Sequence, residues 1–394
     1  MDFELDKDQR AWRDEVRAFL RENVTPELLA EIAERGSEHL DGHVGAFNQK
    51  LAEKGWLGLN WPKEYGGLGL GPAYQHIMVN EFGLSGAPNP TLTVTSVGPI
   101  IMRHGTQQNK EEFLPLIARG ETFAVGYSEP DSGTDLASLK TRADLDGDEW
   151  VINGQKIWNS WAHMATHEWL CVRTNHDVPK HRGISVIMVP INSPGIEVRP
   201  LHTWGGFQTN HTFFTDVRVP KTNLIGEKDR GWQYITGALD MERGAIAHAG
   251  DLRRAVDEMI AAARVTLSDG SRPIDNPDIR RKIAQLDADV EVCILIGLET
   301  VSMLESDQIP TIALTEEKIL SSELRQRIAD VGTQMLGMQG LLTRGDASAV
   351  SDGEFERQYR GSPLLRFGGG TNEVMRDVIA QRGHGMPSYG RSRR

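Results

Sequence analysis

The first third of the chain has the hydrophobic spacing of amphipathic helices. Four apolar residues recur at i, i+4, i+7 and i+8, which is one face of a helix: Trp12, Val16, Phe19 and Leu20. A second helical stretch follows, with Pro26 near its start and Gly36 at its end. These patterns predict an N-terminal α-helical domain over residues 1–120.

From about residue 121 the period of the pattern becomes that of strands. Trp150 and Ile152 alternate with polar neighbours just after Asp146-Gly147, a dipeptide typical of a β-hairpin turn. Three further short segments are apolar or alternating, and a proline follows each: residues 184–189, 196–199 and 216–219. Short strands at this spacing predict a middle antiparallel β domain, barrel-like in form, over residues 121–230.

Helical spacing returns after residue 230, in two long apolar stripes. One stripe holds Ile283, Leu286, Val290, Ile294 and Leu298, and the other holds Leu320, Leu324, Ile328, Val331 and Met335. They predict a C-terminal four-helix-bundle domain over residues 231–394. The fold class is therefore α+β, in the order α–β–α, which differs from the alternating βαβ pattern of a nucleotide-binding sheet.

Composition excludes several classes of protein. The chain has 394 residues and a formal net charge of −12, which disfavours nucleic acid or an anionic membrane surface as a partner. Cys171 and Cys293 stand far apart and form no disulfide framework. No apolar run is long enough to span a bilayer, and the first residues do not form a signal peptide. We therefore expect a soluble cytoplasmic protein.

Two segments of the middle region carry candidate chemistry. The loop in residues 123–135, FAVGYSEPDSGTD, combines hydroxyl side chains with a glycine, which suits a phosphate or the polar edge of a flavin. In residues 153–160, NGQKIWNS, the Trp158 ring can cover a planar cofactor, and Ser160 can donate a hydrogen bond to its edge. Composition alone favours the plainer alternatives, a polar turn entering a strand for the loop and a core position for the tryptophan. His163 and His167 are spaced i, i+4, but they follow a predicted strand, so no metal site is expected.

Together with two further segments, these motifs resemble the acyl-CoA dehydrogenase family. The further segments are GWLGLNWPKEYGGLG at residues 55–69 and RFGGGTNEV at residues 366–374, and the similarity runs over roughly residues 3–386. The resemblance implies an enzyme of that fold which uses FAD to desaturate an acyl-CoA thioester to the 2,3-enoyl-CoA. In the reaction that the resemblance implies, a base removes the α-proton of the thioester, and the hydride from the β-carbon passes to flavin N5.

The resemblance also implies which positions contact the cofactor. They are Val125, Tyr127 and Ser128 at the isoalloxazine; Gly133 and Thr134 at the diphosphate; Trp158 and Ser160 against the flavin; Thr371 and Glu373 at the adenosine side; and Gln334 and Gly337 at the FAD of a neighbouring subunit. Thr134 is also implied to lie near the substrate thioester.

The resemblance implies that the catalytic base of this chain lies on a different segment from the one that carries the base in many family members. Those members carry a glutamate just before the terminal Gly-Thr, where this chain has Gly369 within the trio 368–370. A second lineage, resembling isovaleryl- and long-chain-type enzymes, places the glutamate on a helix of the third domain. Glu242 falls on that position, and the adjacent Arg243 matches an arginine near the CoA chain. Only a desolvated carboxylate suits the removal of an α-proton.

Departures from the family pattern leave alternatives open. At the turn 268–273, Leu267 just before it and Gly270 within it stand where many members have the Arg and Phe that reach a neighbouring subunit's FAD. The glycine trio, in which Gly369 faces the acyl group, implies a wide pocket like that of relatives that handle steroid side chains.

The alternatives are an acyl-CoA oxidase or flavin monooxygenase of the same fold, and a flavin-poor structural subunit of a heteromeric dehydrogenase. Implied partners are acyl-CoA, an electron-transferring flavoprotein, and further subunits in a homotetramer, homodimer or heterotetramer.

Overall fold

The N-terminal part of the computed structural model is helical, as the spacing predicts. The structure describes residues 4–36, 41–246, 249–306 and 308–387, except the side chains of residue 240 and residues 242–246. The helices of this part are α1 (Lys7–Asn23), α2 (Pro26–Arg35), α3 (Gly42–Glu53), α4 (Pro72–Ser85), α5 (Gly98–His104) and α6 (Gln107–Ala118). In α1 the four residues of the predicted stripe are buried, and the N-cap Asp6 forms a capping box with Gln9.

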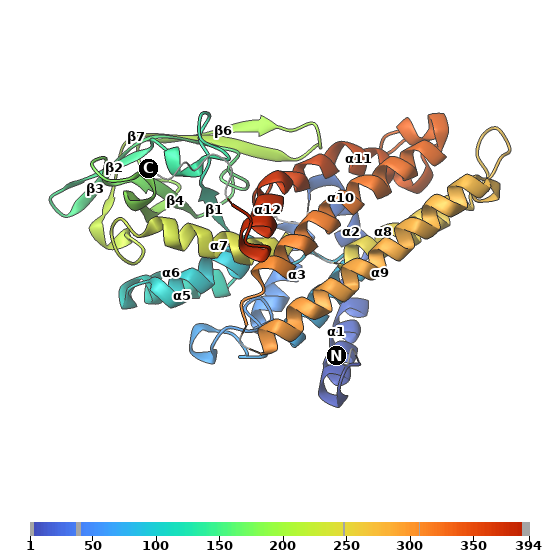
Figure 1. Ribbon diagram of the computed structural model, residues 1–394, viewed down its shortest axis with the longest axis horizontal. Coiled ribbons are helices and arrows are strands. Elements are labelled where there is room, and N and C mark those ends of the chain that lie inside the picture. Colours follow the sequence, from blue (N-terminus) through green and yellow to red (C-terminus); the bar gives the residue numbers. More distant parts are fainter. Residues whose placement is uncertain (1–3, 37–40, 247–248, 307, 388–394) are drawn as a thin grey trace.

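The middle part is a seven-stranded sheet at one end of the molecule (Figure 1). Its strands are β1 (Phe123–Gly126), β2 (Arg142–Asp146), β3 (Glu149–Ile157), β4 (His167–Arg173), β5 (Ile184–Pro190), β6 (Ile196–His202) and β7 (Gln208–Pro220). The order is β1-β4-β2-β3-β7-β6, with β5 paired to β4. The hairpin predicted at Asp146-Gly147 joins β2 to β3.

The direction of the strands departs in part from the sequence prediction. Four pairings are antiparallel, namely β2–β3, β3–β7, β4–β5 and β6–β7. However, β1 runs parallel to β4, and β2 meets β4 through a parallel bridge at Arg142. Alternation of apolar residues places a side chain on one face of a sheet and carries no information on strand direction.

The C-terminal part is helical and contains the longest elements. Its helices are α7 (Gly231–Ile246), α8 (Ala249–Ala263), α9 (Pro277–Glu305), α10 (Thr311–Met335), α11 (Glu354–Gly361) and α12 (Asn372–Val378). Helices α8, α9 and α10 pack on one another (Figure 1). Helix α4 packs against α8 and α9. The predicted stripes are buried or half-buried except at Leu320, which is 39 % exposed. At this level α10 turns Lys318 and Ser322 inward, so Leu320 lies on its outer side.

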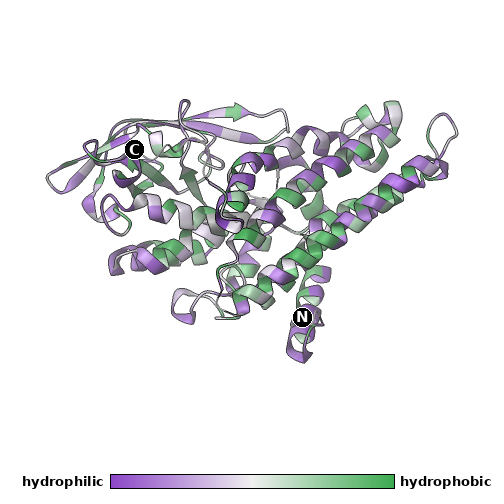
Figure 2. Cartoon of the chain, in the orientation of Figure 1, coloured by the Kyte–Doolittle hydropathy of each residue, from purple (hydrophilic) through white to green (hydrophobic). Residues whose placement is uncertain are grey.

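One hydrophobic core joins the first two parts. It runs from Trp12 through Phe123 of β1 and Trp169 of β4 to Ala238 of α7, so the N-terminal helices and the sheet share it. Hydrophobic residues line the packed sides of the helices, whereas the projecting β2–β3 hairpin is hydrophilic (Figure 2). Among the described helices, none is long and apolar enough to cross a membrane.

Candidate functional site

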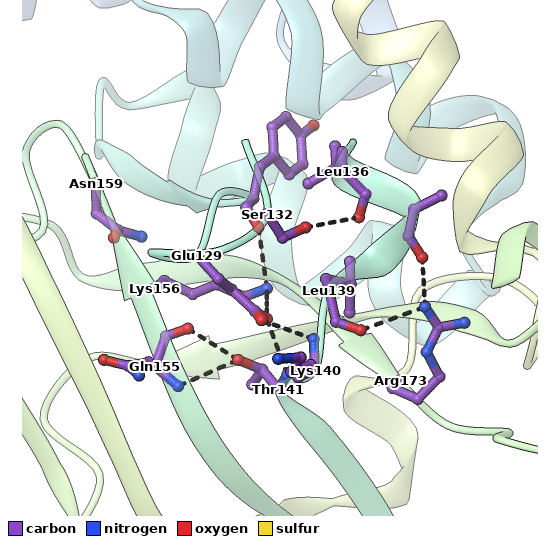
Figure 3. Close-up of polar contacts among 12 residues, drawn as sticks. Glu129, Ser132, Leu136, Leu139, Lys140, Thr141, Gln155, Lys156, Asn159 and Arg173 are labelled. Atoms are coloured by element: carbon purple, nitrogen blue, oxygen red, sulfur yellow. Dashed lines mark hydrogen bonds and ion pairs between the residues drawn. The ribbon is translucent and has the colours of Figure 1, made fainter. Parts of the chain in front are cut away.

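The loop that follows β1 is held on its interior side by a buried ion pair. Glu129 and Ser132 exchange two backbone hydrogen bonds, which close the loop. The Glu129 carboxylate accepts hydrogen bonds from the backbone N–H groups of Lys140 (2.7 Å) and Thr141 (2.8 Å) and from Lys156 Nζ (2.8 Å; Figure 3). Lys156 Nζ also donates to the Tyr127 carbonyl at 3.0 Å. The loop is thereby held rigidly by atoms that do not face solvent.

The charges of this anchor are balanced inside the protein. Burial alone would raise the pKa of Glu129, but the Lys156 ammonium and the two backbone donors outweigh burial and hold that pKa below its usual value. The side chain of Lys156 is completely buried, and that of Glu129 is 6 % exposed. The outer residues of the loop, Gly133 and Thr134, are exposed. The Glu129 carboxylate thus stabilises the conformation of the loop, while the outer face of the loop stays exposed.

The segment after β3 lies beside this loop. The Ile157 N–H donates to the Ser128 carbonyl at 2.9 Å, which joins the two candidate segments directly. Trp158 and Trp161 have positive φ angles of 66° and 63°, a backbone conformation that costs free energy for bulky side chains. Trp158 is 61 % exposed, so the alternative of a core tryptophan is wrong. Ser160 is exposed as well.

Buried Asn159 holds this strained segment in place. Its Nδ2 donates to the Val125 carbonyl at 3.2 Å and to Glu168 Oε1 at 2.6 Å (Asn159 is labelled in Figure 3). Its backbone N–H donates to the Asn210 carbonyl, and its own carbonyl accepts from Asn210 Nδ2. Four candidate residues of the sequence analysis, Val125, Tyr127, Ser128 and Trp158, are therefore on two segments that are hydrogen-bonded together.

The C-terminal candidate segment is anchored by a second buried lysine. Lys318 Nζ on α10 donates to the Arg366 carbonyl (3.2 Å), the Gly370 carbonyl (2.7 Å) and Asn372 Oδ1 (2.7 Å). Thr371 is the N-cap of α12 and accepts a hydrogen bond from the Val374 N–H through its side chain. Glu373 is exposed, 3.7 Å from the Arg366 guanidinium.

Two glycines of this turn adopt positive φ angles, which residues with a side chain rarely adopt. Gly369 and Gly370 have φ angles of 67° and 100°, which disfavour any residue with a side chain. A Cβ on Gly370 would also meet the Met375 side chain at 2.7 Å. Two of the three glycines are therefore explained by the conformation of the turn. Only Gly368 lies in ordinary backbone, where a Cβ would be 3.8 Å from the Leu364 carbonyl.

Gln334 and Gly337 lie far from that turn within one chain. Gln334 is exposed on α10, sixteen positions after Lys318, which is about 24 Å along a helix. Its amide donates to Asp330. Gly337 is exposed at a φ of 56°, with no atom within 4 Å of an added Cβ. Their predicted contact with a neighbouring subunit's FAD remains a prediction.

Glu242 and Arg243 lie on helix α7, but their side chains are outside the described residues. Gly369, the predicted substrate contact, is buried. His163 contacts Asn210, and His167 contacts Thr166. In the described ranges, no three His, Cys, Asp or Glu residues are grouped closely enough to hold a metal ion.

Sequence reasoning missed the buried charged residues that build this site. Lys156 occupies the same face of β3 as the buried Trp150 and Ile152, and Glu168 directly precedes the apolar run 169–172 of β4. A charge at an inward position of a strand is a signal for a buried partner, because charged groups are rarely buried alone. Lys318 sits among inward residues of α10 and gives the same signal.

Comparisons with known proteins cover nearly the whole chain. The models described as the N-terminal, middle and C-terminal domains of acyl-CoA dehydrogenase match residues 6–121, 124–217 and 229–384. The acyl-CoA dehydrogenase FadE26 of Mycobacterium tuberculosis is 39 % identical over 97 % of this chain and 98 % of its own length. FadE29 of the same organism is 36 % identical over 98 % of this chain and 99 % of its own.

Two solved structures share the fold closely. A structure described as the Tcur3481-Tcur3483 steroid ACAD superposes with a TM-score of 0.90 at 36 % identity, covering 98 % of this chain and 100 % of its own. The ChsE4-ChsE5 complex from Mycobacterium tuberculosis gives a TM-score of 0.88 at 37 % identity with the same coverage.

Proposed function

The chain belongs to the acyl-CoA dehydrogenase family, a family of oxidoreductases, and from this premise we propose that it is an FAD-dependent dehydrogenase of acyl-CoA thioesters. One observation carries the proposal. The loop 127–134 and the segment 158–160 are locked together by buried bonds, yet their outer residues are open. A rigid, exposed surface of this kind is what binding a large planar cofactor requires.

The residues present fit FAD. Exposed Trp158 offers a ring face, and Ser160 beside it offers a hydroxyl. At Gly133 no atom lies within 4 Å of an added Cβ, so a ligand can approach the backbone there. Thr134 adds a hydroxyl next to that open backbone, which suits a diphosphate.

When bound, FAD supplies a hydride acceptor at N5. We assign Glu242 as the base, whose carboxylate oxygen takes the α-proton of the thioester, and Arg243 as a contact for the CoA chain. Thr134 and Gly369 are assigned to the thioester and acyl group. A base in a site that excludes water keeps enough basicity for this weakly acidic proton.

The acyl group we propose is bulky, with a branched or polycyclic part. Support comes from the related structure described as a steroid ACAD and from the side-chain-free turn at residues 368–370. We further propose that an electron-transferring flavoprotein reoxidises the cofactor and that the chain works as an oligomer.

A second candidate is a flavin-poor subunit of a heteromeric dehydrogenase. It is favoured by the turn 268–273, which lacks the family's Arg and Phe and is instead held by a hydrogen bond from the Ser268 N–H to Gln339. The description of one relative as a ChsE4-ChsE5 complex also favours it. An oxidase or monooxygenase of the same fold is the remaining alternative.

The first experiment is the visible absorption spectrum of the purified protein. The proposal expects a yellow protein with about one flavin per chain, which bulky acyl-CoAs bleach under anaerobic conditions. A colourless chain that FAD cannot restore supports the subunit alternative. Fast reoxidation by air with release of peroxide supports the oxidase.

The assignment of the base is tested by Glu242→Gln in the same anaerobic assay. Flavin content should stay as in the wild type, while the rate of bleaching falls about 10²–10⁴-fold. Glu299→Gln, at an exposed position of α9, is the matched control and should bleach normally. Normal bleaching by the Glu242 variant contradicts the assignment.

A further inference from the structure

A buried carboxyl lies directly behind the two candidate flavin-contact segments. Glu168 on β4 is fully buried, next to Ala124 of the parallel strand β1 and opposite Val189 of β5. None of the roles assigned above uses it. Its position matters if FAD binds as proposed, so this inference rests on the proposed function.

A single amide connects Glu168 to both segments. Asn159, between Trp158 and Ser160, donates from Nδ2 to Glu168 Oε1 at 2.6 Å and to the Val125 carbonyl at 3.2 Å. Space for the carboxyl depends on Gly126, where an added Cβ would stand 2.3 Å from Glu168 Oε1. The backbone, the amide and the carboxyl therefore form one built arrangement.

Within the described part of the chain, this arrangement has spare polar atoms. Glu168 Oε2 and Asn159 Oδ1 are buried and have no hydrogen-bond partner. Such atoms are costly in a protein interior, more so when the group carries a charge. The protonated carboxyl is the state of lower free energy, because it buries no charge.

The nearby cation does not outweigh the burial of Glu168, because it is already paired. Lys156 on β3 is the nearby cation, and it already pairs with Glu129 at 2.8 Å and binds the Tyr127 carbonyl. Two titratable groups on the same strand stay neutral as well, because burial raises the pKa of the Cys171 thiol and lowers the pKa of His167. An ionised Glu168 would leave one unbalanced negative charge that competes with Glu129 for Lys156.

We propose that protonated Glu168 is a positioning residue which, through Asn159, holds the Trp158–Ser160 segment against β1, and that its ionisation loosens the binding of FAD by drawing Lys156 away from Glu129 and from the Tyr127 carbonyl. Burial raises the pKa of Glu168 to about 8, and Lys156 opposes part of this rise. The hold is therefore present at neutral pH and is lost as the pH rises through about 8.

The test measures the rate at which the purified holoprotein releases FAD, followed by the fluorescence of free flavin, between pH 6 and pH 9.5. In the wild type we expect release to become about tenfold faster above pH 8, which corresponds to the loss of one charge-assisted hydrogen bond from Lys156 to the loop. Glu168→Gln keeps the neutral shape and the acceptor for Asn159, so its release rate should match that of wild type at pH 7 and stay constant to pH 9.5.

Two further variants separate positioning from a general effect of burial. Asn159→Leu removes the connecting amide and should release FAD about fivefold faster at every pH, the value of one neutral hydrogen bond. Glu317→Gln removes another buried carboxyl with a raised pKa, located in the helical part, and should keep the wild-type pH profile. The proposal is wrong if Glu168→Gln keeps the wild-type rise in release above pH 8, or if Glu317→Gln abolishes it.

Amide hydrogen exchange tests the positioning role of Glu168 in protein that contains no flavin. In flavin-free protein, the amides of residues 157–160 should exchange faster in the wild type at pH 9 than in Glu168→Gln, after correction for the intrinsic pH effect. If the protein binds no flavin but this difference exists, the proposed function fails and the positioning role stands. Equal protection in the two proteins contradicts the positioning role, whether or not flavin binds.

Discussion

Two buried lysines fix the two candidate cofactor-binding regions, and the described contacts of the two differ. Lys156 of the β sheet is paired with the Glu129 carboxylate, whereas Lys318 of the helical part donates to three neutral oxygens around the glycine turn. Both side chains are fully buried. An ammonium group has three donors, so in each region it can tie together irregular backbone that no helix or sheet would satisfy.

The buried carboxyls of the same regions extend this comparison. Burial raises the pKa of Glu168 in the sheet and of Glu317 in α10 to about 8 each. Glu168 is bonded to a candidate cofactor segment, while Glu317 accepts only a long hydrogen bond from Thr300 among the described contacts. A raised pKa by itself therefore does not identify a functional group, and the neighbouring contacts must decide.

The largest effect should come from breaking the charge balance under the loop. Lys156→Met leaves the buried Glu129 without its cation and should lower the free energy of unfolding by about 4 kcal/mol. Denaturant titration of the flavin-free protein measures this loss. As a control, Lys140→Met removes only an exposed pair with Asp131 and should cost a few tenths of a kcal/mol at most. A loss under about 1 kcal/mol for Lys156→Met would show that the ion pair does not support the loop.

The next effect concerns pH and the helical carboxyl. Because the pKa of Glu317 is near its usual 4.5 when unfolded and about 8 when folded, the native state keeps the proton longer. Its contribution to stability is therefore full below about pH 4.5 and is lost as pH rises through 8. The stability of wild type minus that of Glu317→Gln should fall by about 1.4 kcal/mol for each pH unit between pH 4.5 and pH 8. A flat difference curve would place the folded pKa near the ordinary value.

Breaking the second lysine anchor should cost less than breaking the first. Lys318→Met removes the donor of three hydrogen bonds to neutral acceptors, and we expect a loss of about 2 kcal/mol. Hydrogen exchange should show the loss of protection concentrated in residues 366–374. Lys282→Met, at an exposed position of α9, is the control. A loss equal to that of Lys156→Met would contradict the distinction drawn between the two anchors.

The smallest effect compares one exposed glycine from each region. Neither Gly133 nor Gly337 has an atom within 4 Å of an added Cβ, but only Gly337 has a positive φ, of 56°. Gly337→Ala should therefore cost about 1 kcal/mol of backbone strain. Gly133→Ala should be neutral or slightly stabilising, because it only restricts the unfolded chain. Thermal unfolding of flavin-free protein distinguishes the two, and equal midpoints would contradict the strain argument.

Local periodicity was enough to predict the regular elements. The four-residue stripe of α1 is buried, α2 begins at Pro26 and ends before Gly36, and the β2–β3 turn lies at Asp146-Gly147. Each of these features depends on residues close together in sequence. The parallel pairing of β1 with β4 was not predicted, because direction depends on the path of the chain between them.

The interior of the candidate site was less accessible to sequence analysis. The contacts from Lys156 to Glu129 and from Lys318 to Asn372 join residues 27 and 54 positions apart. No local pattern pairs residues at such distances. The motifs identified Tyr127, Ser128 and Trp158 as residues of one site, and the hydrogen bond between Ile157 and Ser128 brings their segments together. The roles assigned to Glu242 and Arg243 remain predictions that depend on the resemblance to the family.

The core that joins the N-terminal helices to the sheet and α7 has a consequence for synthesis of the chain on the ribosome. Trp12, Phe47 and Phe82 pack in a cluster that includes residues as late as Tyr234 and Ala238. When residue 120 has been added, this cluster still lacks β1, β4 and α7. At about 5–20 residues per second, the missing partners emerge on the order of ten seconds later. During that interval the nascent helices expose apolar surface, so the early part of the chain is the segment most in need of a chaperone.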